Sequence, residues 1–410
     1  MLDESLLDDA EALARADHHG LLRGTAGAGA RVRTAARQAT EAGLTSLRPD
    51  GRPRGLLVAG PGPAAGCAAD LLAAVNHGAV PVALLRPTGA GAAPHALRWT
   101  LPGWAGPVDL LLVVTPDGTE PGLAFLAEQA YRRGCTVVAV TPAGGPLAET
   151  VSGTHGLAVP VAPPPAAPAD GTPGSPPGRP ATVPGTLWAL LTPLLVLTDR
   201  LGLGETPGTA VQALADRLDR IAERCGPATP TYANPAKTLA VELAEALPVL
   251  WSEGPLASAA ARHFTTVLAA LPGRPALAAE LPEALTSHAA LLTGAFAGGS
   301  GTGSGTAPDD FFRDRVEEAQ ALRPRLVLLR DSPPPAPGPP QASPQDARPP
   351  QTGGDTGETA APAVRALAHA HGTALSELRP AEGSSALEAA ADLVATTDFA
   401  AVYLTLTASA

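Results

Sequence analysis

Two glycine-containing loops follow apolar runs of the sequence, and the first of them could bind an anion. It extends from Gly60 to Gly66, directly after the apolar run 55–59. Gly60 and Gly62 have no side chain, so a ligand can approach the backbone closely. The N–H groups at the start of a following helix favour negative charge. The same loop also fits a plain strand-to-helix turn, in which glycine and proline only end the strand.

The second loop, residues 115–120, adds hydroxyl groups to this pattern. Thr115, Gly118 and Thr119 follow another apolar run and precede a helical segment. Threonine hydroxyls and free N–H groups at a helix start can hold a phosphate. Asp117 lies among them, and its negative charge would repel that ligand. Threonine or aspartate as an ordinary helix N-cap explains the loop equally well.

Both loops must be positioned by a sheet, and the sequence predicts a parallel one. Short apolar runs alternate with helical patterns, which is typical of strands that are buried on both faces and covered by helices. The predicted strands of this block are residues 55–59, 80–85, 109–114 and 135–141. Ligands of such sheets bind at the carboxyl ends of the strands, where both loops begin.

A second block repeats the alternation. Its predicted strands are residues 248–251, 276–280 and 325–330. Its predicted helices are residues 185–203, 208–225, 237–246, 257–271, 283–293 and 385–397. The predicted fold class is therefore α/β, with two successive open parallel-sheet units, each a flavodoxin-like three-layer α/β/α arrangement.

Proline and glycine mark the boundaries between these blocks. The predicted order is an N-terminal domain (1–160), a Pro-rich linker (161–183), connecting helices (184–229) and a C-terminal domain (230–410). The C-terminal domain contains an insertion, 332–362, whose lack of large apolar residues predicts disorder. The acidic segment 2–15 has leucines at helical spacing, and we expect it to pack as a terminal helix on its own domain.

The overall composition excludes several classes of protein. Lys and Arg total 28 against 39 Asp and Glu, which gives a net charge of −11 and no basic surplus for nucleic-acid binding. No apolar run approaches 18 residues, and the acidic N-terminus lacks a signal peptide's positive region, so we expect a cytoplasmic protein that does not bind membranes. Cys67, Cys135 and Cys225 lie far apart and are expected to be free thiols. No histidine has a partner at metal-ligand spacing, so we expect no metal and no cofactor.

Together with parts of the second block, the two loops resemble a known family. The succession strand, glycine loop, helix, strand and loop 115–120 is similar to the sugar isomerase (SIS) domain. Further segments resemble motifs of the bifunctional phosphoglucose/phosphomannose isomerases: Asn234-Pro235-Ala236-Lys237, Leu247-Pro248-Val249, Arg262, Leu281-Pro282-Glu283 and Asp398 to Leu404. The resemblance extends from about residue 55 to about residue 405.

The resemblance implies two SIS domains, a hexose 6-phosphate ligand and a homodimer, since the family's active sites form between subunits. These enzymes convert glucose 6-phosphate or mannose 6-phosphate into fructose 6-phosphate by moving a proton between C1 and C2 through an enediol. Serines and threonines hold the phosphate, a glutamate abstracts the proton and an arginine stabilises the enediolate. A histidine from the neighbouring subunit and a C-terminal lysine serve ring opening. Gly60, Gly62, Thr115, Gly118 and Thr119 are then the implied phosphate-binding residues.

Few of the family's catalytic groups have a counterpart here. The phosphate serine of the first loop falls at Ala64, and the glutamate falls at Ala269. The arginine is expected near Pro184-Gly185, and the nearest arginine in the sequence is Arg179. Neither alanine can perform the chemistry of the residue it replaces.

A slip of the alignment by one or two residues supplies only partial replacements. The histidine, expected at Thr286, could be His288, and Glu283 or Glu280 could serve as the base. The C-terminal lysine has no replacement, because the only lysine is Lys237, which is expected to cap or salt-bridge the start of its helix. Loss of several groups that each contribute about 10²-fold removes most of the rate enhancement, so we expect a degraded catalytic site.

Three functions remain open on the sequence alone. The first is a sugar-phosphate-binding protein with a degraded site. The second is an active aldose–ketose isomerase that uses Glu283, His288 or Thr119 in altered roles. The third is a non-catalytic dimer partner or scaffold. Turnover separates the second from the others, and ligand binding separates the first from the third.

Overall fold

The computed structural model describes residues 4–49, 51–89, 97–162, 184–204, 206–293, 323–331 and 359–408. Most of the predicted linker, including Arg179, and residues 332–358 of the predicted insertion lie outside the described residues.

The first half contains the predicted parallel sheet. Its strands are β1 (Gly55–Ala59), β2 (Val82–Leu85), β3 (Asp109–Val114), β4 (Thr136–Thr141) and β5 (Leu157–Pro160). They are all parallel and lie in the order β2-β1-β3-β4-β5, which is the flavodoxin-like doubly wound order. The sequence pattern misses β5, because this short strand ends at a proline that leads into the Pro-rich segment.

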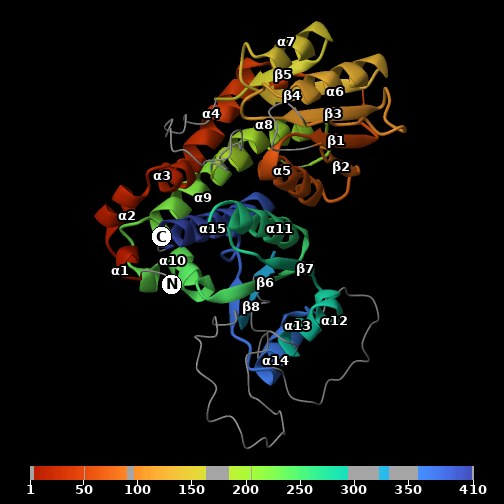
Figure 1. The fold of residues 1–410 in the computed structure, drawn as a ribbon. Coiled ribbons are helices and arrows are strands. Elements are labelled where there is room, and N and C mark those ends of the chain that lie inside the picture. The colour runs from red at the N-terminus through yellow and green to blue at the C-terminus, as the bar shows by residue number, and fades with distance from the viewer. Residues whose placement is uncertain are drawn as a thin grey trace, which may run out of the picture.

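Helices cover both faces of this sheet, as the apolar strands require. α6 (Pro121–Arg132) and α7 (Pro146–Gly153) pack on one face, where they enclose Leu57 and Leu111. α4 (Ala28–Glu41), α5 (Gly62–Val75) and α8 (Thr186–Arg200) pack on the other face, against side chains such as Leu112. Figure 1 shows this three-layer arrangement in the upper part of the molecule.

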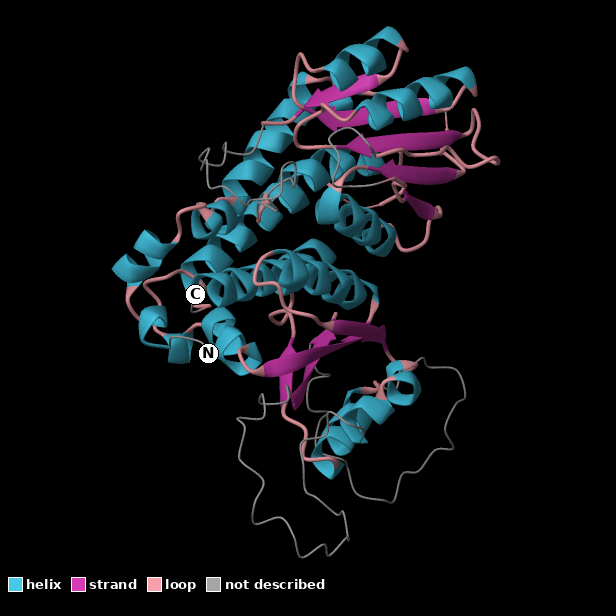
Figure 2. Ribbon diagram, viewed as in Figure 1, coloured by secondary structure: helices cyan, strands magenta, loops and turns pink. Residues whose placement is uncertain are grey.

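The second half contains a smaller sheet of the same kind. β6 (Ala246–Glu253), β7 (Leu277–Glu280), β8 (Arg323–Arg330) and β9 (Leu375–Leu378) are parallel in the order β7-β6-β8-β9. α10 (Pro235–Leu243), α11 (Pro255–Ala270) and α15 (Ala386–Leu406) lie on one face. α12 (Ala284–Ser287), α13 (Ala289–Thr293) and α14 (Ala361–Ala370) lie on the other (Figure 2). The fold class is therefore α/β with two open parallel sheets, as predicted.

Several predicted boundaries in the second half are wrong. The helix expected over 283–293 is broken into α12 and α13, because the hydroxyls of Thr286 and Ser287 donate to the Glu283 carbonyl and compete with helix propagation. α14 begins at Ala361, so the last two residues of the predicted disordered insertion are helical. The final helix continues to Leu406, well beyond the expected end.

The two halves share one core. The largest cluster of buried residues includes Leu112 of β3, Leu250 of β6 and Ala400 of α15. α8 and α9 (Gly208–Arg224) are the predicted connecting helices: α8 packs on α4 and α5 of the first half, and α9 packs on α4 of the first half and α15 of the second. Between the halves, the Arg262 guanidinium of α11 donates to Asp70 of α5 over 2.9 Å.

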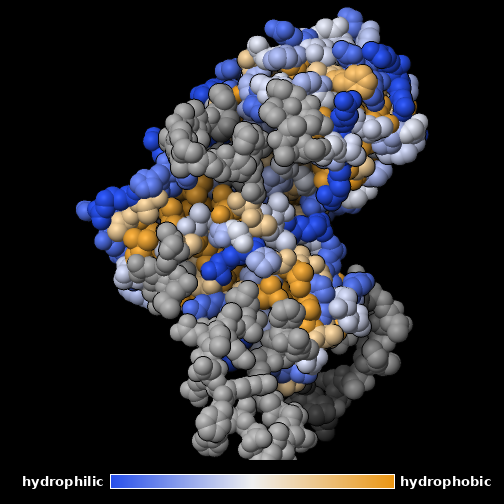
Figure 3. All heavy atoms as spheres, in the orientation of Figure 1, coloured by the Kyte–Doolittle hydropathy of each residue, from blue (hydrophilic) through white to orange (hydrophobic). Residues whose placement is uncertain are grey.

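The N-terminal segment forms α1 (Glu4–Leu7), α2 (Ala10–Ala16) and α3 (Leu21–Ala26). The expectation of a terminal helix packed on its own domain is wrong, because the segment forms three helices and contacts the C-terminal half. Asp8 accepts hydrogen bonds of 2.8 Å from both the N–H and the hydroxyl of Thr231, which belongs to the C-terminal half. Figure 3 shows apolar groups gathered near these helices in the middle of the molecule.

One described helix, α15, has the length and apolar composition of a membrane span, although the sequence pattern shows no such run. Its apolar window is 89% buried between other elements of the fold. A helix that is apolar on all sides and enclosed by protein is typical of a core helix. α15 therefore provides the centre on which α9, α10 and α11 pack.

Candidate functional site

The two predicted phosphate loops lie at the same edge of the first sheet. β1 ends at Ala59 and β3 ends at Val114, and these neighbouring strands pair in parallel register. A Cβ atom on Gly60 would lie 2.1 Å from the Val114 carbonyl oxygen, so only glycine allows the strands to stay this close. Gly62 has φ +73° at the start of α5, in the left-handed region that favours glycine.

The loop after β3 satisfies its own N–H groups. The Gly118 N–H donates to the hydroxyl oxygen of buried Thr115 over 3.3 Å, and the Thr119 N–H donates to the Asp117 carboxylate over 3.0 Å. The Thr115 hydroxyl in turn donates to Asp117 over 3.3 Å. The Asp117 carboxylate thus occupies the place of an anion in this loop, and a phosphate would have to displace it.

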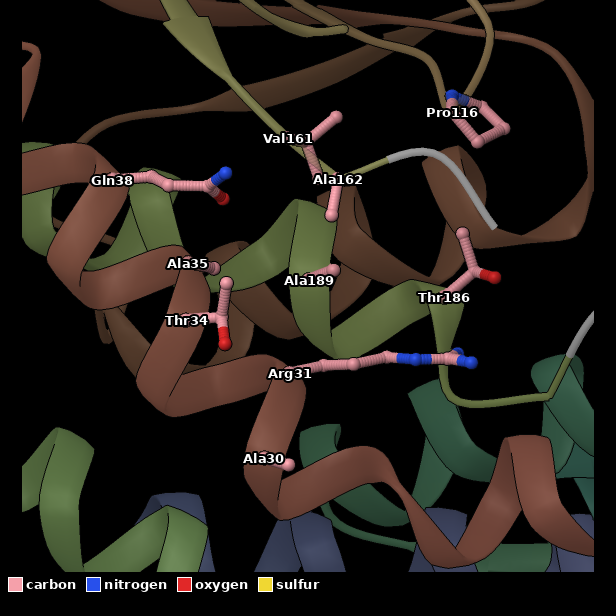
Figure 4. Close-up of a pocket in the computed structure, with 10 residues that line it drawn as sticks. All are labelled: Ala30, Arg31, Thr34, Ala35, Gln38, Pro116, Val161, Ala162, Thr186 and Ala189. Carbon is pink, nitrogen blue, oxygen red and sulfur yellow. The ribbon is translucent and has the colours of Figure 1, made fainter. Parts of the chain in front are cut away.

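A cavity of about 160 Å³ lies beside this edge of the sheet (Figure 4). Pro116, in the loop after β3, forms part of its wall, and the rest comes from α4, the start of α8 and the segment after β5. The lining residues are Ala30, Arg31, Thr34, Ala35, Gln38, Pro116, Val161, Ala162, Thr186 and Ala189. Arg31, Thr34 and Gln38 are three or four residues apart along α4, so they project from one face of that helix.

Arg31 is the charged group of this cavity. Its side chain extends along the cavity toward Thr186 (Figure 4), and Nη1 donates to the Pro184 carbonyl over 3.1 Å. Among the described residues it has no carboxylate within ion-pair distance, and burial lowers the pKa of its guanidinium. A half-buried cation without an anionic partner is stabilised by any anion that binds beside it.

Two further polar atoms of the cavity lack partners. The Thr186 hydroxyl and the Gln38 amide oxygen are buried, and neither has a hydrogen-bond partner among the described residues. Buried polar groups are normally satisfied by protein, water or ligand. The cavity therefore offers a cation, a hydroxyl and an amide oxygen to a polar, anionic guest.

Arg31 lies where the sequence comparison expects the family's arginine. A Cβ atom on Gly185 would lie 3.0 Å from Arg31 Nη1. The guanidinium thus reaches the Pro184-Gly185 position from a different helix, about 150 residues upstream. Sequence reasoning missed this residue, and the only available signal was an arginine, a threonine and a glutamine on one face of a predicted helix.

The predicted catalytic candidates lie elsewhere. Glu283 is exposed at the start of α12, and His288 follows the same helix. The Trp251 indole N–H donates to His288 Nδ1 over 3.3 Å, and burial lowers the pKa of that imidazole. Both residues belong to the face of the second sheet covered by α12 to α14, the face turned away from the first sheet. Within one chain, the structure does not bring them to Gly60, Thr115 or Arg31.

Other sequence candidates have structural partners. Glu280 and Asp70 both bind the Arg262 guanidinium. The Lys237 ammonium is fully buried and donates to the carbonyls of Pro227 and Thr229, each over 2.8 Å. It lies 4.0 Å from Asp8, while the cap of its helix is the Asn234 side chain. The only lysine therefore stabilises the turn at residues 227–229 and is not free for catalysis.

A buried His–Asp pair connects the two halves near the first loop. His263 Nε2 lies 2.9 Å from Asp398, and both side chains are at most 5% exposed. They line a void of about 20 Å³ together with Ala64 and Gly185, room for about one water molecule. Burial lowers the pKa of the imidazole, but the neighbouring Cys67 sulfur and the Asp398 carboxylate raise it well above its ordinary value. Sequence spacing gave no signal for this pair, because 135 residues separate its members.

Known proteins share parts of this sequence and this architecture. Residues 232–409 match the family described as the bacterial phospho-glucose isomerase C-terminal SIS domain. No curated protein matches the chain. Among solved structures, the chain is similar to a hypothetical protein from Thermus thermophilus, with 17% identity, a TM-score of 0.55 and coverage of 98% of this chain and 89% of that one.

Two further solved structures share the fold. One is a candidate phosphosugar isomerase from Clostridium difficile, with 8% identity, a TM-score of 0.55 and coverage of 94% and 93% of the two chains. The other is a candidate phosphosugar isomerase from Bacillus subtilis, with 12% identity, a TM-score of 0.52 and coverage of 92% and 94%. At these identities the similarity shows the fold, and it extends over both halves of the chain.

Proposed function

The chain is a SIS-domain protein whose C-terminal half belongs to the bacterial phosphoglucose isomerase family, and we propose that it binds a hexose 6-phosphate without isomerising it. The observation that carries this proposal is Arg31, a half-buried guanidinium with no anionic partner among the described residues. It lies in a cavity at the carboxyl edge of the first sheet, where ligands of such sheets bind.

In this proposal the phosphate binds to Arg31 and Thr186. A guanidinium presents several N–H donors that match a phosphate bidentately, and the Thr186 hydroxyl supplies another donor. Gly60, Gly62, Thr115, Gly118 and Thr119 form the adjoining edge, and the threonines would donate once Asp117 is displaced.

The absence of turnover follows from the groups at the family's catalytic positions. Ala64 and Ala269 lack the functional atoms of the residues they replace, and Ala269 lies on α11. The only lysine of the chain is held by backbone carbonyls. Removing groups that act together in catalysis lowers the rate by many orders of magnitude.

The active-isomerase alternative requires a homodimer. His288 and Glu283 lie on the far face of the second sheet, so they could reach a phosphosugar only at the first sheet of a second copy. We propose a cytoplasmic homodimer for either function, and in the third reading the chain serves only as a dimer partner. Turnover separates the active isomerase from the other two functions, and ligand titration separates a sugar-phosphate binder from a dimer partner.

The test is isothermal titration of fructose 6-phosphate and glucose 6-phosphate into the purified protein, with Arg31→Ala as the key variant. Arg37→Ala is the matched control, because Arg37 is exposed on the same helix. We expect binding that Arg31→Ala weakens at least tenfold and Arg37→Ala leaves unchanged. Equal binding by all three proteins would show that the phosphate does not bind in this cavity. Absence of binding from the folded wild type would leave the dimer-partner function.

A further inference from the structure

A second and larger cavity lies at the opposite end of the first sheet. Its volume is about 480 Å³, within the range of small-molecule sites. It is formed by the segment before β1, the turn from α5 to β2, the turn between α8 and α9, and the start of α15. These elements belong to the amino ends of the strands, so the cavity is separate from the Arg31 cavity at the carboxyl ends.

Asn76 is an unsatisfied polar residue in the lining of this cavity. It is only 1% exposed, and neither its amide nitrogen nor its amide oxygen has a hydrogen-bond partner among the described residues. Leaving a buried donor and a buried acceptor unpaired costs about 1–3 kcal/mol for each group. A ligand that offers one acceptor and one donor side by side would satisfy both atoms.

The rim of the same cavity favours an anion. Arg52 and His77 line it, and both are exposed to solvent. The start of the 21-residue helix α15 lies there too. Ser385 and Glu388 form a capping box there: the Ser385 hydroxyl oxygen accepts the Glu388 N–H, and the Glu388 carboxylate accepts the Ser385 N–H over 3.1 Å. The N–H groups of Ala386 and Leu387 are left without partners among the described residues. Helix N-termini of this kind attract phosphate groups.

We propose that this cavity is a second ligand site, which takes a nucleoside monophosphate. The phosphate binds at the Arg52 rim and the first turn of α15, and the base lies inside with its edge against Asn76. A carboxamide pairs bidentately with the adjacent donor and acceptor of an adenine edge, which makes an adenine nucleotide the best probe. The site does not rest on the sugar-phosphate function, because the two cavities share no lining residue.

The close packing of Gly204 against Asn76 suggests a variant that tests the base-binding part of the cavity. A Cβ atom on Gly204 would lie 2.8 Å from the Asn76 amide oxygen, so Gly204→Ala pushes into the groups that contact the base. Arg52→Ala removes the exposed cation of the rim without touching the core. Asn76→Leu removes both amide atoms, and its thermal unfolding must first show that it still folds.

The experiment is equilibrium titration of adenosine monophosphate into the full chain, with inorganic phosphate and adenosine as part-ligands. We expect saturable binding that Arg52→Ala and Gly204→Ala each weaken at least tenfold, with Arg31→Ala binding as tightly as the wild type. Weak binding of either part alone is expected. Absence of saturable binding to the folded wild type would overturn the site, as would equal binding by the wild type and both variants. Loss of binding in Arg31→Ala alone would place the nucleotide in the other cavity and also contradict the proposal.

Discussion

At the scale of single residues, the buried pair of His263 and Asp398 makes stability depend on pH. The folded state raises the imidazole pKa well above its ordinary value of 6.5. The pair's contribution is therefore complete below about pH 6.5 and is lost as the pH rises through the folded value. Below about pH 6.5, where the imidazole is charged, removing one partner of a buried pair typically lowers the free energy of unfolding by about 3–5 kcal/mol.

We therefore predict that Asp398→Asn lowers the free energy of unfolding most at pH 6 and progressively less toward pH 9. Urea denaturation of the variant and the wild type at several pH values measures this difference. Asp216→Asn, which alters an exposed ion pair with Arg33, serves as the control. A difference that stays constant or grows with pH would contradict the assignment of the charge to His263.

The same scale shows what sequence alone could not supply. Arg31 and Pro184 are 153 residues apart, as are Arg200 and Leu47, and only the packing of α4 on α8 joins such positions. Comparison with the family's motifs shows that the expected arginine is missing at Pro184-Gly185. It cannot show that the guanidinium of Arg31 reaches this position from another helix. Glu283 and His288 illustrate the reverse case, since proximity to a motif in sequence did not bring them to the cavity.

At the scale of elements, the sequence predicts the strands enclosed on both faces and also the short β2 and β7, but it misses the short β5 and β9. β1 and β3 are continuous apolar runs and are fully buried, so their composition identifies them. β9, with the sequence LSEL, is partly exposed along its length and carries a serine and a glutamate. β9 exists because β8 provides a partner edge, a tertiary effect that local composition does not contain.

The loop between β3 and α6 leads to a second prediction. Its Asp117 carboxylate accepts a hydrogen bond from the Thr119 N–H, and Asp117 follows Pro116, which lines the Arg31 cavity. Asp117→Ser keeps a hydroxyl acceptor while it removes the charge. Two like charges about 4 Å apart near a protein surface repel by about 1–4 kcal/mol, so hexose 6-phosphate affinity should rise at least fivefold.

Titration calorimetry of Asp117→Ser beside the wild type measures this gain. Glu128→Gln is the control, because it removes an equal charge from the exposed surface of α6. Unchanged affinity in Asp117→Ser would show that the phosphate does not approach this loop.

At the scale of the whole molecule, the shared core predicts that the two α/β units unfold together. α5 of the first half packs on α11 of the second, and buried residues of both sheets belong to one cluster. Trp99 and Trp251 report on different halves and are both buried. Tryptophan fluorescence and far-UV circular dichroism should therefore give coincident urea transitions. Two separated transitions would contradict a common core.

We propose that the chain binds a hexose 6-phosphate and performs no isomerisation. Nuclear magnetic resonance of fructose 6-phosphate in D₂O, with protein near the ligand concentration, tests both parts in one sample. Binding broadens the sugar resonances, and an enediol step would exchange carbon-bound hydrogen for deuterium. We predict broadening that Arg31→Ala abolishes, with no deuterium incorporated at C1. Deuterium at C1, or sharp resonances throughout, would contradict the account.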